Sequence, residues 1–301
     1  PVFCISDLLI HLAQEQMAKN AKDVVEGEAL NLIVGGRPLA GEEKDAVKAN
    51  VLKLLDDKYG VEEEDFLSAE LEIVPAGKAR DMGFDRSMIL GYGHDDRVCA
   101  YPSMMAVLDY EGTPDYTLCC IITDKEEIGS VGATGMASHY LENTVAELYA
   151  CTADYCELAV RRCLRNSRML SSDVSAGYDP NFASAFEKKN SAFLGRGICF
   201  NKFTGSRGKS GSNDANPEFM ASLRKIMDDA GVAFQTAELG RVDLGGGGTI
   251  AYLCAKYGMN VIDSGIAVLS MHAPYEIISK VDLYEGYRCY CAFLKGAKPV
   301  D

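Results

Sequence analysis

The sequence lacks any run of about 18 apolar residues, the length that a helix needs to span a bilayer. It also opens without a basic stretch followed by a short apolar segment, the pattern of a secretory signal. We therefore expect a cytoplasmic protein with no membrane partner.

Positive charge is scarce as well. Lysine and arginine number 30 against 44 aspartate and glutamate residues, which gives a net charge of −14. Such a balance repels nucleic-acid backbones and anionic lipid surfaces. The composition therefore argues against a nucleic-acid partner and makes cations the more natural ligands.

A Cys-x-x-Cys motif is absent, although the chain contains 11 cysteines. Most of them lie within apolar patterns, and even the closely spaced Cys289 and Cys291 fall in a helical one. An odd number in such positions indicates reduced, buried thiols rather than a disulfide framework. We therefore predict no thiolate metal site.

The length of 301 residues predicts one large domain and a smaller unit. Up to about residue 72 the sequence predicts packing helices and a charged loop without chemistry-bearing residues. One of these helices carries Val47, Val51 and Leu54 on one face and ends at Gly60. We expect residues 1–72 to form a separate small domain.

Strands and helices alternate over residues 73–301. Short apolar runs predict strands at residues 71–74 and 118–123, and the second run is continuous enough to predict a central strand that is covered on both faces. The pattern indicates an α/β fold, a three-layer sandwich with a central mixed sheet. Ligand sites in such folds gather at the carboxyl ends of strands.

Five residues of chemical interest fall at predicted strand ends or in the turns beside them. They are Asp95, Glu126, Glu127, Asp173 and His272. Each also has an ordinary structural interpretation: a helix N-cap or turn for an aspartate, a solvated loop for the glutamate pair, and a core position for the histidine. Several such residues at successive strand ends favour a common site.

Carboxylates combined with imidazole, without thiolates, suit a divalent ion such as zinc, with cobalt and manganese as alternatives. A two-metal site needs one carboxylate between the ions and a separate base for the proton of the attacking water. Of the adjacent Glu126 and Glu127, one can bind metal while its neighbour moves the proton.

The chain resembles the aspartyl aminopeptidase family of metallopeptidases, family M18, from about residue 70 onward. The resemblance rests on five motifs in this order: DDRVC at 95–99, KEEIGS at 125–130, SSDV at 171–174, GGGTI at 246–250 and VLSMHAPYE at 268–276. It implies a zinc-peptidase-like fold. It also implies an enzyme that removes the N-terminal residue of a peptide substrate, with Asp and Glu as the candidates for that residue.

The resemblance also implies roles for the five residues. Asp95 would lie between two zinc ions, Glu127 and His272 would be terminal ligands of one ion, and Asp173 would be a terminal ligand of the other. Glu126 would be the general base. The choice of Glu126 over Glu127 as the base rests on the resemblance.

One departure from the family pattern concerns a further histidine ligand, which the family carries in a segment before its dimerisation insert. No segment of this sequence matches that motif, and His11, His94 and His139 lie in other contexts. We therefore expect a missing N-terminal segment to supply this histidine. Residues 1–72 would then be the remainder of a dimerisation or lid domain, and the family implies dimer-based homo-oligomers, up to a dodecamer.

Two elements are candidates for substrate binding. A glycine run that includes Gly247 and Gly248, followed by Thr249, can present backbone N–H groups to an oxyanion, although a plain flexible turn is the alternative. Lys202 follows a predicted strand and could contact an acidic substrate side chain, although it could equally be solvated.

Other functions remain open at the level of the sequence. The chain could be an inactive fragment, or an assembly or peptide-binding subunit, as the absent histidine and the long N-terminal stretch without chemistry suggest. It could also be a related di-metal deacylase with the same chemistry.

Overall fold

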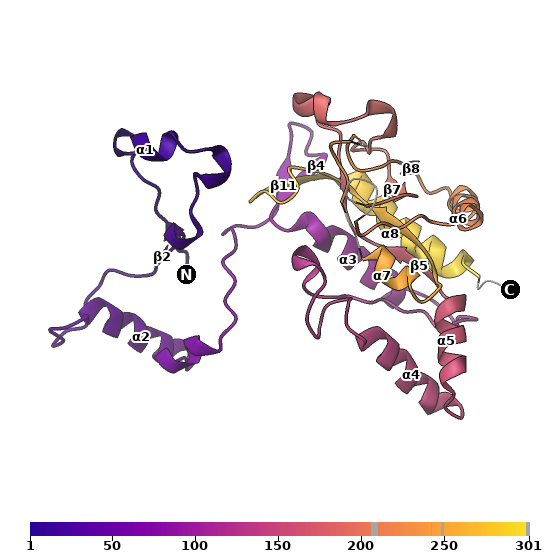
Figure 1. Cartoon of the computed structure of the whole chain (residues 1–301), viewed down its shortest axis with the longest axis horizontal. Coiled ribbons are helices and arrows are strands. Elements are labelled where there is room, and N and C mark those ends of the chain that lie inside the picture. Colours follow the sequence, from indigo (N-terminus) through magenta and orange to yellow (C-terminus); the bar gives the residue numbers. More distant parts are fainter. Residues whose placement is uncertain (206–209, 242, 248–249, 299–301) are drawn as a thin grey trace. The chain divides into compact units, whose positions relative to one another are not determined.

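A computed structural model describes residues 1–205, 210–241, 243–247 and 250–298 of the chain. The chain divides into two compact units, Pro1–Ala76 (unit 1) and Gly77–Asp301 (unit 2) (Figure 1). Within the described residues, no helix has the length and apolar character needed to cross a membrane.

Unit 1 contains little regular structure. Its strands are β1 (Cys4–Ile5) and β2 (Leu32–Ile33), which pair antiparallel, and its α-helices are α1 (Gln14–Met17) and α2 (Ala46–Tyr59). The predicted end of α2 at Gly60 is correct, because Gly60 adopts the left-handed conformation that closes a helix, with φ of 64°. Many apolar side chains of this unit are exposed, among them Leu9 and Leu12.

The described residues of unit 2 form two mixed sheets. The first has five strands in the order β3-β4-β11-β10-β6, and the second has four in the order β5-β9-β7-β8. The strands are β3 (Arg80–Met82), β4 (Met88–Gly91), β5 (Arg168–Ser171), β6 (Ser175–Ala176), β7 (Ile198–Asn201), β8 (Phe234–Thr236), β9 (Asn260–Gly265), β10 (Ala267–Leu269) and β11 (Glu276–Ser279). The helices are α3 (His94–Leu108), α4 (Tyr140–Thr152), α5 (Glu157–Asn166), α6 (Pro217–Ala230), α7 (Ala251–Ala255) and α8 (Lys280–Gly296).

Helices cover both faces of the second sheet. Because side chains alternate along a strand, Ile262 of β9 packs in the core with α6 and α8, whereas its neighbour Val261 packs in a different core with α4 and α7. Phe200 of β7 joins the α6–α8 side, where Leu223 is fully buried. The arrangement is the predicted α/β sandwich of three layers, although its strands form two sheets rather than one.

Two predicted strands are wrong. Residues 71–74 and 118–123 have no regular structure, and Ile122 is 60% exposed. A strand exists only where a neighbour satisfies its backbone N–H and C=O groups, and the ladders of the described residues offer none to these runs. Only one face of the second run is covered, since Ile121 packs beside α4 and α7 while Ile122 faces outward.

Candidate metal centre

Three side chains from distant parts of the sequence form a potential metal site. Asp95 lies in the first turn of α3, Glu127 lies in the short 3-10 helix η5 (Glu126–Ile128), and His272 lies between β10 and β11. The Nε2 atom of His272 is 3.0 Å from Oδ2 of Asp95 and 3.5 Å from Oε2 of Glu127. One ligand atom of each lies within 4.8 Å of those of the other two, so all three could bind a single ion.

A second triplet shares Asp95 with the first. It adds Asp96, the next residue of α3, and Asp173, which lies between β5 and β6. Oδ1 of Asp96 is buried and has no hydrogen-bond partner in the described part of the chain. A buried carboxylate oxygen without a donor is costly, and a cation nearby would remove that cost.

The negative charges of the carboxylates in this cluster repel one another, and burial together with this repulsion raises their pKa values. Burial raises the pKa of Asp95 to about 7, and the negative charge of Glu127 adds to the rise. Burial, followed by the charge of Asp173, raises the pKa of Asp96 to about 9, and burial together with Glu126 raises that of Asp173. Neighbouring carboxylates disfavour ionisation in this way when no cation lies between them, so the donor set fits one or more divalent ions.

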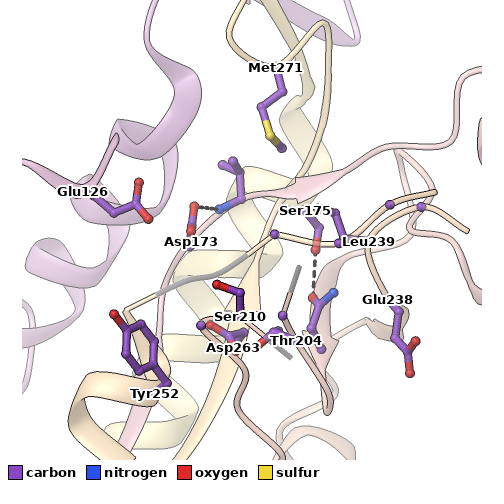
Figure 2. A pocket seen from close by; sticks show the side chains of 18 of the residues that line it. Glu126, Asp173, Ser175, Thr204, Ser210, Glu238, Leu239, Tyr252, Asp263 and Met271 are labelled. Atoms are coloured by element: carbon purple, nitrogen blue, oxygen red, sulfur yellow. Dashed lines mark hydrogen bonds between the residues drawn. The ribbon is translucent and has the colours of Figure 1, made fainter. Parts of the chain in front are cut away.

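Glu126 belongs to neither triplet of the described residues, although it borders both. Figure 2 shows its carboxylate directed toward Asp173. Burial, followed by the charge of Glu127, raises the pKa of Glu126, while His272 opposes the rise. A carboxyl group held beside a metal site with a raised pKa is suited to take up and release a proton.

Backbone geometry around the site is unusual. Lys125 and Ser130 flank η5 with φ of 66° and 57°, and Ser270 and His272 have φ of 57° and 65°. Side chains other than glycine rarely adopt this left-handed conformation, which is over-represented at functional sites because the surrounding structure must enforce it.

A glycine allows the Asp173 loop to approach the sheet. A Cβ atom on Gly265, at the end of β9, would lie only 1.6 Å from the carbonyl oxygen of Asp173. No other residue type fits there without moving that loop.

A cavity of about 440 Å³ lies beside the cluster. Asp95, Glu126, Glu127, Asp173 and His272 all contribute to its lining, so the structure brings the five predicted residues together. Its other walls come from the loop after β8, from β7 and from α7, whose Tyr252 Figure 2 shows at the lower edge.

The predicted substrate-binding residues have different locations. Gly247 lines the cavity. Gly248 and Thr249 lie outside the described residues. Lys202 is not among the described residues that line the cavity, and its ammonium group forms an ion pair with Asp214.

Two residues near the cluster, Asp96 and Glu276, lie within motifs of the sequence but were not assigned a role at the site. Asp96 directly follows Asp95, so its place in the Asp-Asp pair was the available signal. Glu276 closes the motif that contains His272, and its carboxylate accepts hydrogen bonds from the backbone N–H groups of Asp95 and His272. Nothing in the local pattern separates such a carboxylate from an ordinary strand residue.

The fold and the site together describe an α/β protein with a cluster of carboxylates and one imidazole that could hold divalent ions. The sequence matches the family described as Aminopeptidase I zinc metalloprotease (M18) over residues 1–294. The chain therefore belongs to the peptidase M18 family, which confirms the resemblance.

Individual relatives agree with this assignment. A Clostridium acetobutylicum protein named Probable M18 family aminopeptidase 1 is 61% identical over 295 residues, which cover 98% of this chain and 63% of that protein. The crystal structure of aminopeptidase I from the same species matches with a TM-score of 0.88 and 59% identity, over 98% of this chain and 63% of that one. The M18 aminopeptidase structure from Thermotoga maritima matches with a TM-score of 0.92 and 44% identity, over 99% and 65%.

These matches confirm the α/β fold class. The chain spans 63% to 65% of the length of these relatives.

Proposed function

We propose that the chain carries the metal site and general base of an aminopeptidase, which hydrolyses the bond after the N-terminal residue of a peptide. The observation that carries the proposal is the Asp95–Glu127–His272 triplet, whose ligand atoms lie within 4.8 Å of one another beside a cavity. The family described as a zinc metalloprotease supports zinc as the ion.

The residues divide the chemistry among themselves. A bound divalent ion supplies Lewis acidity for the peptide carbonyl and lowers the pKa of water. Glu126, next to the ligands but outside both triplets, takes the proton of the attacking water and later returns it to the leaving amine. Gly247 brings backbone close to the cavity, where its N–H can approach the developing oxyanion.

We further propose two ions. Asp95 belongs to both triplets, so its two carboxylate oxygens can serve one ion with Glu127 and His272 and another with Asp173. The first ion would have three protein ligands in this chain. The second would have Asp95 and Asp173, with Asp96 nearby, and no imidazole among the described residues.

A further part of an M18 polypeptide would supply the missing imidazole. Three exposed apolar side chains support this idea: Tyr101 and Leu108 on the outer face of α3, which are 60% and 68% exposed, and Ile122, which is 60% exposed. About a third of the length of the relatives lies outside the match. A further segment that packs against such side chains would cover them, and it could pair with residues 118–122 as a strand.

Glu126→Gln is the test of the catalytic assignment. The variant keeps the size of the side chain and removes its ability to accept a proton. It should retain the zinc content of the wild type while peptide cleavage falls by about 10²–10⁴-fold, the usual contribution of a general base. Glu187→Gln, a substitution at an exposed residue that is not among the described residues lining the cavity, is the control. Measurable cleavage that is equal for both variants would refute the role of Glu126.

The proposed further segment requires its own test. Mixing the chain with the part of the Clostridium acetobutylicum relative that lies outside the match should form a complex and raise the zinc content above that of the chain alone. Failure of the two polypeptides to associate would overturn this part of the proposal. An inactive assembly subunit would instead associate without zinc, and a deacylase would cleave N-acyl substrates in preference to peptides.

Selectivity for Asp or Glu and assembly into homo-oligomers are further parts of the proposal. Lys202 is paired with Asp214, so it needs to leave that pair to contact an acidic substrate. The exposed apolar side chains of unit 1, such as Leu9 and Leu12, which are 59% and 70% exposed, would be covered in a dimer. Sedimentation of the purified chain tests the assembly.

A further inference from the structure

Glu276 is a buried charged residue beside the metal centre with no role in the chemistry described above. It is the first residue of β11 and is 2% exposed. One of its carboxylate oxygens, Oε2, accepts the backbone N–H of Asp95 at 3.0 Å, and the other, Oε1, accepts the backbone N–H of His272 at 2.9 Å. A single side chain therefore joins two ligand-bearing segments that lie far apart in the sequence.

These two hydrogen bonds explain why a carboxylate can be buried at this point. Burying an ionised carboxylate is costly unless donors satisfy it, and N–H bonds to a charged acceptor are stronger than bonds between neutral groups. Neither N–H group lies in regular helix or strand geometry, where a backbone carbonyl would accept its hydrogen bond. Asp95 lies where the backbone of α3 departs from helical geometry, and His272 has φ of 65°.

We propose that Glu276 is a positioning residue of the metal centre: its carboxylate holds the backbone of Asp95 and His272 at the separation that lets both side chains bind one ion. This inference rests on the proposed metal site. It predicts that Glu276 affects the affinity for the metal beyond its effect on folding, since partners behind metal ligands typically contribute about 10–100-fold in affinity.

Asp282 provides a matched control. It is 0% exposed, and its two oxygens accept the backbone N–H groups of Gly195 and Gly197 at 2.7 Å each. The local arrangement is the same as at Glu276, with one buried carboxylate across two backbone donors, but neither donor belongs to a proposed ligand. Replacing either acid by its amide leaves one N–H facing an NH₂ group, at a similar cost in stability.

The experiment measures zinc affinity by competition with a chelator for the wild type, Glu276→Gln and Asp282→Asn, together with thermal unfolding of the metal-free proteins. Both variants should unfold at lower temperature. Zinc affinity should fall by about 10–100-fold for Glu276→Gln and stay unchanged for Asp282→Asn. The visible spectrum of bound cobalt should change in the first variant alone. If Glu276→Gln does not fold, Glu276→Asp replaces it, because its shorter side chain reaches only one donor.

Each other outcome overturns a specific statement. Unchanged zinc affinity in the Glu276 variant, or an equal loss in the Asp282 variant, refutes the positioning role and leaves the proposed function standing. A wild-type chain that binds no zinc overturns the proposed metal site, and the positioning role with it.

Discussion

The stability of the metal-free chain should fall as the pH rises from about 5 to 8. The pKa of Asp95 rises from an ordinary 3.8 to about 7, and that of Asp96 to about 9. Between about pH 5 and pH 7 these carboxyls are protonated in the folded chain and ionised in the unfolded chain. The folded state thus binds more protons than the unfolded state, and its stability falls as the pH rises.

The size of the effect follows from the number of protons. One carboxyl that is protonated only in the folded state changes the free energy of unfolding by about 1.4 kcal/mol per pH unit. One such carboxyl of the cluster then lowers stability by roughly 4 kcal/mol between pH 5 and pH 8. That loss is a large share of the 5–15 kcal/mol that typically separates the folded and unfolded states.

Urea unfolding of the chelator-treated chain at several pH values, followed by far-ultraviolet circular dichroism, measures this slope. Asp96→Asn should reduce this slope by about the contribution of one proton, because asparagine does not titrate. Asp229→Asn should leave the slope intact, since Asp229 lies on the surface of α6. Saturating zinc should reverse the trend, because carboxylates must lose their protons to bind a metal. Stability that stays constant or rises with pH in the metal-free chain would refute the reasoning.

Three further predictions concern single residues. Gly265→Ala should destabilise unit 2 and weaken zinc binding, as measured by thermal unfolding with and without zinc, because the new Cβ collides with the Asp173 loop. Leu223→Ala should lower the free energy of unfolding by about 2–5 kcal/mol in urea, because Leu223 is fully buried; a smaller loss would show that the core collapses around the gap. Lys202→Ala should reduce cleavage of substrates with N-terminal Asp or Glu more than that of Leu substrates, and equal losses would exclude Lys202 from selectivity.

Part of the candidate site could be predicted, because some of its residues follow strands or begin helices, where sequence patterns are strong. Asp95, Asp173 and His272 were each expected at a strand end or in a turn beside one, and each lies at the start of a helix or after a strand. The structure adds that these ends meet at one place. Periodicity locates elements along the chain but does not measure the distances between them.

The predicted strand at residues 118–123 shows the limit of this reasoning. An apolar run indicates that burial of the segment is favourable. A strand also requires a neighbouring strand that hydrogen-bonds to its backbone, and whether one is present depends on the rest of the fold. The opposite error occurred at β9, which we did not predict. Its sequence NVIDSG contains polar residues although the strand is buried: Asp263 and Ser264 are both buried. A sequence of this kind gives no continuous apolar run.

Glu276 escaped prediction for a different reason. Its importance depends on two backbone N–H groups that come from other segments, and no local pattern of residues encodes such a contact. Buried carboxylates that accept backbone hydrogen bonds become visible only once the fold is known.

The central claim, that Asp95, Glu127 and His272 bind one divalent ion, is tested most directly by crystals of the chain soaked in zinc. An anomalous difference map should show a peak about 2.0–2.2 Å from a carboxylate oxygen of Asp95 and of Glu127 and from Nε2 of His272. A map with no peak between these three side chains would contradict the account.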